Sequence, residues 1–187
     1  APTTAPTTAP TTAPTTAPTT APTTAPTTAP TTAPTTAPTT APSEVVPVAV
    51  SSTAFRTVRN GWGPVERNRS NGELKAGDGR TLKIAGRSYS TGLGVHAASE
   101  VVVPVTGFST FTAEVGVDSE VGASGSVVFQ VWNGSTKLAD SGVLRGGQSA
   151  AAMSVDISGA TEIRLVVTNA GDGGTGDHAD WADAFLS

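Results

Sequence analysis

Residues 111–117 read Phe111-Thr112-Ala113-Glu114-Val115-Gly116-Val117, with apolar residues at every second position. Successive side chains of a β-strand point to opposite faces of a sheet, so this period of two predicts a strand with one buried face. Residues 127–132 repeat the pattern and are followed by Asn133-Gly134, the strongest short signal for a β-hairpin turn. Together the two stretches predict an all-β domain.

Short apolar runs separated by glycine-rich breaks extend this pattern over most of the chain. All 21 glycines lie after residue 43. About ten short strands without an amphipathic helix indicate a two-sheet β-sandwich. Pro47 and Pro104 lack the N–H group that an inner strand needs, so we expect the strands 45–50 and 100–105 at sheet edges. The other expected strands are 81–85 and 87–90, paired as a hairpin around Gly86, then 136–140, 153–157, 163–168 and 182–186, with Ile163, Leu165 and Val167 pointing inward.

Residues 1–40 are ten copies of Ala-Pro-Thr-Thr. No side chain there is larger than threonine, so the repeat cannot bury a core. We expect residues 1–43 to be a disordered or extended linker, either bare or O-glycosylated, and residues 44–187 to be one folded domain. Because the chain opens inside a linker, we expect a fragment of a secreted, bacterial, multidomain protein whose catalytic domain precedes it.

The charge and the missing cysteines exclude several classes of function. All 11 basic and 15 acidic residues lie in the folded part and give a net charge of −4. An acidic domain without a basic stripe is a poor nucleic-acid binder. The absence of cysteine excludes disulfides, thiolate metal sites and a cysteine nucleophile. No apolar run approaches the roughly 20 residues of a membrane span. We therefore expect a monomer without nucleic-acid partners and without a membrane span.

One polar, glycine-rich stretch contains the first candidate site. It reads Asn60-Gly61-Trp62-Gly63-Pro64-Val65-Glu66-Arg67-Asn68-Arg69-Ser70-Asn71-Gly72-Glu73. The glycines beside Trp62 remove bulk, so the loop can present an indole face next to hydrogen-bonding groups. A pyranose stacks its C–H face on an indole and pairs its hydroxyls with carboxylates and amides. We predict a sugar site with Trp62, Glu66 and Asn71. The alternatives are that Trp62 caps the sandwich and that the charged residues form internal salt bridges.

Three blocks of the chain together resemble the NPCBM family, the family 51 carbohydrate-binding modules. They are the stretch just quoted, Gly92-Leu93-Gly94-Val95-His96-Ala97, and Asp177-His178-Ala179-Asp180-Trp181-Ala182-Asp183-Ala184. The resemblance implies a jelly-roll β-sandwich of the galactose-binding type, appended to a glycoside hydrolase, that binds galactose-containing glycans, often with a structural calcium ion. Family members often carry an acidic residue and a tryptophan before the first block. This chain departs from them with Ser51-Ser52-Thr53-Ala54-Phe55.

Further aromatic and imidazole side chains are candidates for sugar contacts. His96 and His178 are the only histidines. Each of them either closes the sugar pocket or braces a loop through hydrogen bonds of its ring nitrogens. Trp132, which precedes the hairpin turn, is a second stacking candidate, and Tyr89 could supply a phenol hydroxyl. Trp181 continues into an apolar stretch, so we expect it mainly in the core.

Acidic residues near strand ends are candidate ligands for a structural Ca²⁺ ion. Asp183 lies in the last expected strand, where sugar-binding sandwiches often place a calcium-binding acid. Asp118, together with Glu120, follows the strand that ends at Val117. The alternative for these carboxylates is simple solvation.

We predict a non-catalytic carbohydrate-binding module that directs an attached glycoside hydrolase to galactose-containing glycans. Two alternatives are an adhesive, protein-binding sandwich and a small glycan-active enzyme. Glycoside hydrolysis needs two opposed carboxylates, and acidic residues are available, but a small sandwich usually lacks a deep cleft. The sequence also lacks the Gly-x-Ser-x-Gly motif of serine hydrolases. We therefore expect no enzyme.

Overall fold

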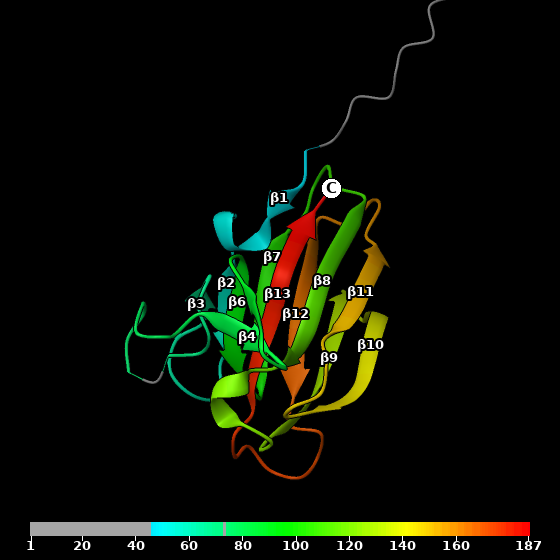
Figure 1. Ribbon diagram of the computed structural model, residues 1–187. Helices are drawn as coiled ribbons and strands as arrows, with labels where there is room; N and C mark the ends of the chain where they lie inside the picture. Colours follow the sequence, from blue (N-terminus) through cyan, green and yellow to red (C-terminus); the bar gives the residue numbers. More distant parts are fainter. Residues whose placement is uncertain (1–45, 73) are drawn as a thin grey trace, which may run out of the picture. The chain divides into compact units, whose positions relative to one another are not determined.

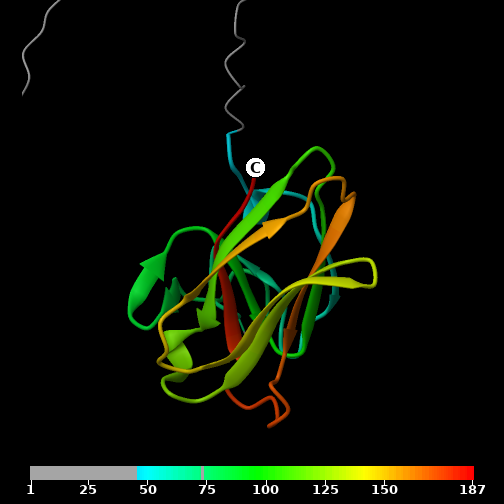
Figure 2. The same ribbon diagram turned by 90° about the vertical axis from the view of Figure 1, so that its right-hand side faces the viewer.

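The computed structural model describes residues 46–72 and 74–187, so the expected linker, residues 1–43, lies outside the described part. The described residues form an all-β domain in which two antiparallel sheets pack face to face (Figures 1 and 2). No helix in these residues is long and apolar enough to cross a membrane. The predicted fold class is confirmed.

Each sheet has five strands along its main path. The first sheet has the order β11 (Ala151–Asp156), β8 (Thr110–Val117), β13 (His178–Leu186), β6 (Gly92–His96) and β3 (Glu66–Arg67), and β1 (Val48–Ala49) pairs with the end of β13. The second sheet has the order β10 (Thr136–Arg145), β9 (Ser126–Asn133), β12 (Glu162–Thr168), β7 (Ser99–Pro104) and β2 (Arg56–Arg59). The hairpin of β4 (Leu82–Ile84) and β5 (Arg87–Tyr89) lies against the first sheet, and two 3-10 turns are η1 (Val50–Ser52) and η2 (Ser119–Val121).

The core lies between the sheets and contains the residues that the period of two predicts. The inward side chains of β8 and β12 are almost completely buried: Phe111, Ala113, Val115, Val117, Ile163, Leu165 and Val167. Trp181 is completely buried. Its ring meets Phe129 edge to face at a centroid distance of 4.9 Å and Phe111 at 6.0 Å. The expectation that Trp181 belongs to the core is therefore confirmed.

Pro47 indicated an edge strand correctly, whereas Pro104 did not. The strand after Pro47 is short and pairs with β13 alone, as an edge strand should. The prediction that the strand of Pro104 is an edge is wrong, since β7 lies between β12 and β2. Pro104 is the last residue of β7, and β2 reaches only as far as Val102. Pro104 is opposite Glu162 of β12, but the next residue, Val105, donates to Thr161, so the nitrogen of Pro104 faces the other side, where β2 does not reach.

Strand β6 was not expected, because it contains two glycines and lacks a clear period. All five of its residues are buried. A Cβ atom on Gly94 would lie 2.3 Å from the carbonyl oxygen of Arg69, so only glycine lets the loop cross the strand at this distance. Gly92 has a φ of 143° and equally little space beside Trp181. The hairpin turns at Gly86 and Asn133-Gly134 were predicted correctly.

The sheet geometry brings two motif blocks to one end of the domain. β6 ends at His96, β13 begins at His178, and the two residues are directly opposed across the strand pair. This end carries η2 and the 169–177 loop and lies opposite the C-terminus and β1 (Figure 1).

Candidate functional site

Four side chains form a row at this end of the first sheet, which we call the Trp62–Glu120 row. The rings of His96 and His178 meet edge to face with centroids 5.2 Å apart. The indole of Trp62 lies on the other side of His96, at a centroid distance of 6.4 Å and an interplanar angle of 40°. The carboxylate of Glu120 completes the row, 2.6 Å from Nδ1 of His178.

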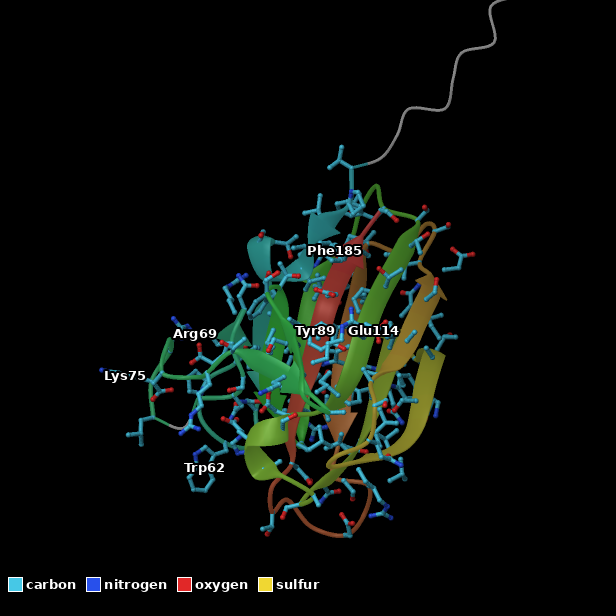
Figure 3. The ribbon with its side chains drawn as sticks, viewed as in Figure 1. Trp62, Arg69, Lys75, Tyr89, Glu114 and Phe185 are labelled. Atoms are coloured by element: carbon cyan, nitrogen blue, oxygen red, sulfur yellow. The ribbon has the colours of Figure 1, made fainter. Side chains whose placement is uncertain are left out.

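Trp62 projects from its loop at the surface of the domain (Figure 3). It is 54% exposed and belongs to neither hydrophobic cluster of the described residues. A cap over the sandwich would bury the ring against the core, and the structure gives no such contact. The indole therefore offers an open face.

Asn60 holds the loop of Trp62 against the end of β6. Its Oδ1 accepts the backbone N–H of His96 at 2.8 Å. Its Nδ2 lies within hydrogen-bonding distance of the carbonyl oxygens of Trp62 (2.7 Å) and Gly63 (3.0 Å) and of Oδ1 of Asn71 (3.0 Å). Gly61 donates to the carbonyl of His96 at 2.9 Å. One amide side chain thus fixes the indole, the imidazole and a second amide relative to one another.

The tautomer of His96 follows from its neighbours. Nδ1 lies 2.8 Å from the carbonyl oxygen of Ala97, which can only accept, so Nδ1 carries the hydrogen. In the neutral ring Nε2 is then an acceptor. Burial lowers the pKa of His96 below its usual value, the nearby His178 lowers it further, and the bond to Ala97 partly opposes both effects. Near pH 7 the row therefore contains a neutral imidazole that can accept a hydroxyl proton.

Glu120 connects the row to the first motif block. Its Oε1 faces His178, and its Oε2 accepts the hydroxyl of Ser70 at 3.2 Å. Asp118 caps η2, because its Oδ1 accepts the N–H of Glu120 at 2.7 Å. The turn that follows β8 therefore points the carboxylate of Glu120 at the start of β13.

Asn71 adds an unused donor beside the row. It is 2% exposed, and its Nδ2 has no hydrogen-bond partner among the described residues. A buried amide without a partner is costly, unless a ligand or water satisfies it. Asn71 lines a hollow of about 250 Å³ together with Arg80, Glu120 and neighbouring loop residues. The hollow and the row therefore meet at Glu120.

Two charged residues of the first block, Glu66 and Arg67, have their contacts elsewhere. Both carboxylate oxygens of the buried Glu66 accept the N–H of Gly77, at 2.9 and 2.8 Å. Arg67 donates to the carbonyls of Ser51 and Thr53 and lies 3.9 Å over the ring of Phe55. These side chains hold loops together through bonds to the backbone, instead of through the internal salt bridges that we considered.

Two aromatic candidates lie elsewhere. Trp132 belongs to β9 in the second sheet, with Lys137 and Arg164 about its ring at 5.8 and 5.5 Å. Tyr89 is 4% exposed beneath the β4–β5 hairpin, beside Glu114 (Figure 3). Neither ring joins the Trp62–Glu120 row.

The two expected calcium ligands each have protein contacts of their own. Asp183 accepts the hydroxyl of Thr91 and lies 3.9 Å from Arg87. Asp118 accepts the N–H groups of Glu120 and Lys83. The described residues contain no group of three or more His, Asp or Glu side chains that could hold a metal ion. Calcium binding by either residue stays a prediction.

Sequence reasoning missed the parts that Asn60 and Glu120 play. Asn60 lies inside the quoted stretch, but one of its four contacts is to His96 at the end of β6, a strand that was not expected. Glu120 was considered only as a calcium ligand or a solvated acid. Its contacts to Ser70 and His178 join three distant segments, which no local pattern reveals.

Comparison with known proteins gives matches along the folded part. The family model described as "NPCBM/NEW2 domain" matches residues 47–187. A Renibacterium salmoninarum protein named as an endo-alpha-N-acetylgalactosaminidase is 40% identical over 129 residues, which are 68% of this chain and 8% of that protein. The alpha-1,3-galactosidase B of Akkermansia muciniphila is 36% identical over 107 residues, 54% of this chain and 13% of that protein. The chain thus spans a small part of both relatives.

Solved structures match as well. The CBM51 of Clostridium perfringens GH95, solved in complex with methyl-galactose, has a TM-score of 0.67 and 32% identity, and the match covers 76% of this chain and all (100%) of that one. CBM51-2 of Clostridium perfringens ZmpB, solved in complex with GlcNAc, has a TM-score of 0.68 and 29% identity over 75% of this chain and 31% of that one.

Proposed function

Since the chain belongs to the NPCBM/NEW2 domain family, we propose that it binds a galactose-containing glycan on the Trp62–Glu120 row. The observation that carries this proposal is an exposed indole face close to a hydrogen-bond acceptor and a hydrogen-bond donor that can serve a ligand. Trp62 is exposed, Nε2 of neutral His96 is an acceptor, and Nδ2 of the buried Asn71 is a donor without a partner.

Family membership assigns the chain to the carbohydrate-binding modules that are appended to glycoside hydrolases, and not to a catalytic domain. This agrees with the three-block resemblance and with the expectation of a non-enzyme. The sandwich matches the CBM51 fold, as that resemblance implied.

The chemistry of the row fits a pyranose. One apolar face of galactose can stack on the indole of Trp62, as C–H groups do on aromatic faces. Its ring hydroxyls would then donate to Nε2 of His96 and accept from Nδ2 of Asn71. Glu120 is already bonded to His178 and Ser70, so it orients the imidazole and contributes at most a further lone pair.

Two observations on relatives support the choice of sugar. The CBM51 of Clostridium perfringens GH95 is complexed with methyl-galactose, and one relative is named as a galactosidase. The GlcNAc complex of the ZmpB module makes N-acetylhexosamines the necessary comparison.

We further propose that the parent protein is an extracellular glycoside hydrolase and that this module holds it on its substrate. The two relatives described above are bacterial proteins that are named as glycoside hydrolases. The row lies at the end of the domain opposite the C-terminus and β1 (Figure 1), so a glycan on the row stays clear of these chain segments.

The proposal is tested by isothermal titration of residues 43–187 with methyl galactoside, GalNAc, GlcNAc and methyl glucoside. We expect the galacto-configured sugars to bind and the glucoside to bind more weakly. Equal binding of all four sugars would reject the galactose preference. No binding to any of them, or to a glycan array, would reject the sugar site and favour a protein partner.

A further inference from the structure

A second hollow adjoins the first at the far side of Glu120. It measures about 340 Å³ and lies between β4 and η2. Its lining residues are Arg80, Thr81, Lys83, Asp118, Ser119 and Glu120. Arg80 and Glu120 line both hollows, so a ligand seated against the row can extend into the second one along the surface.

The walls of this hollow follow from the local sequence. In β4, Leu82 and Ile84 are buried against the first sheet, so the alternation of the strand turns the side chain of Lys83 outward. The opposite wall is η2, which Asp118 caps. The side chains of Arg80 and Lys83 therefore stand on a fixed rim.

The carboxylates of this hollow are already hydrogen-bonded. Asp118 accepts from the backbone N–H of Glu120 through Oδ1 and from that of Lys83, at 2.9 Å, through Oδ2. Glu120 uses one oxygen for His178 and the other for Ser70. Each of the four carboxylate oxygens thus already has one partner in the protein.

The cations, in contrast, are unused. Neither the guanidinium of Arg80 nor the ammonium of Lys83 has a hydrogen bond or ion pair with the described residues. Arginine and lysine are donors only, and Nδ2 of Asn71 in the first hollow is also a donor without a partner. The surface from Asn71 to Lys83 therefore calls for a ligand that supplies acceptors.

We propose that the second hollow is a subsite for an anionic group, a sulfate ester or a carboxylate, on the sugar adjacent to the galactose. This inference rests on the proposed function, because the galactose on the row sets where the next sugar lies. Sulfate and carboxylate oxygens accept charge-assisted hydrogen bonds from guanidinium and ammonium groups. The module would thereby prefer acidic over neutral galactosides.

The test compares three disaccharides by isothermal titration at low salt. Galactosyl-N-acetylglucosamine is the neutral ligand, the same disaccharide with a sulfate on its second sugar is the sulfated one, and galactosyl-glucuronic acid carries the carboxylate. We expect at least one acidic ligand to bind roughly threefold to fivefold more tightly than the neutral one, as partly exposed ion pairs do. The gain should decrease as salt rises. Which acidic ligand gains identifies the anion.

Single variants locate the effect. In Arg80→Gln and Lys83→Gln the gain should shrink while the affinity for the neutral disaccharide stays the same. Arg56→Gln is the matched control, since it removes one exposed positive charge from β2 in the other sheet. Equal affinity for all three ligands, or a gain that survives both variants, overturns the subsite.

Amide chemical shifts separate the two proposals. Binding that never perturbs Trp62 and His96 contradicts the proposed function. Binding that perturbs them but not Arg80 and Lys83 contradicts only the subsite. If none of the ligands binds, both proposals fail.

Discussion

The imidazole of His96 lies edge to face against that of His178, with ring centroids 5.2 Å apart. One ring ends β6 and the other begins β13, and the antiparallel register makes the two residues direct partners. Burial lowers the pKa of His96, and the nearby His178 lowers it further, because a second imidazole this close disfavours the charged form of His96. The pair thus keeps one ring neutral near pH 7.

The first prediction follows from this neutral ring. Protonation of His96 converts Nε2 from an acceptor into a donor. Galactoside affinity should therefore be constant from about pH 8 down to about pH 6.5, the usual pKa of imidazole. It should fall at lower pH, as the lowered pKa of His96 is approached. Titration calorimetry across this range measures the fall. His96→Asn retains a donor to the Ala97 carbonyl but lacks Nε2, so it should bind weakly with no such pH dependence. A full pH dependence in this variant would assign the effect to another group.

The second prediction concerns the indole. Trp62→Ala should weaken galactoside binding about tenfold to a hundredfold, because burying an apolar side chain of this kind contributes roughly 1.5–3 kcal/mol. Its melting temperature should stay near that of the parent, since Trp62 is 54% exposed. Trp132→Ala, in the other sheet, should bind normally. Unfolding of Trp62→Ala would restore the capping interpretation, and weak binding by Trp132→Ala alone would move the sugar to the second sheet.

The sequence was sufficient for the strands that follow a period of two. In β8 and β12 every residue expected to point inward is buried, because alternation alone decides which face meets the core. It failed for β6, where Gly92 and Gly94 are required by the close approach of other segments. A local pattern contains no information about what crosses above a strand, so neither this strand nor the register of its last residue was predicted.

The site shows the same division. Trp62, Asn71 and the two histidines were selected by residue type, and the structure brings them to one end of the domain. Glu66 was selected for the same reason, yet both its oxygens bind the N–H of Gly77. Whether a carboxylate serves a ligand or a loop depends on which backbone groups come near it, and that is settled only by tertiary structure.

The third prediction concerns calcium. The family resemblance implies a structural calcium ion, so we expect a higher melting temperature in millimolar calcium than in excess chelator. A metal ion that binds only the folded domain would stabilise it by about 2.7 kcal/mol at a hundredfold excess over its dissociation constant. That corresponds to a shift of several degrees, roughly 2–8 °C, which differential scanning calorimetry resolves. Identical melting temperatures under the two conditions would contradict this implication of the resemblance.

A second pair of acids lies beneath β4. Asp180 is completely buried, its Oδ2 lies 3.2 Å from the backbone nitrogen of Lys83, and its Oδ1 has no partner among the described residues. Asp118 accepts the same N–H at 2.9 Å. Burial raises the pKa of Asp180 well above its usual value, and the carboxylate of Asp118 and a hydrogen bond to it raise it further. Two carboxyl groups this close do not both ionise easily, so Asp180 keeps its proton well above the pH at which an aspartic acid usually loses it.

The last prediction tests this proton. Because the pKa of Asp180 is raised in the folded domain, the folded domain keeps a proton that the unfolded chain releases above about pH 3.9. The stability that Asp180 contributes at low pH is therefore lost as the pH rises through its pKa in the folded state. Asp180→Asn supplies a neutral donor of the same shape. It should be more stable than the parent at pH 7, with the difference vanishing near pH 4, as measured by urea unfolding. Asp156→Asn is the control of opposite sign: the N–H of Ser158 lowers the pKa of the exposed Asp156, so the parent loses that contribution as pH falls. If Asp180→Asn is less stable than the parent at pH 7, the carboxylate of Asp180 is charged there. The prediction that Asp180 holds a proton at this pH is then wrong.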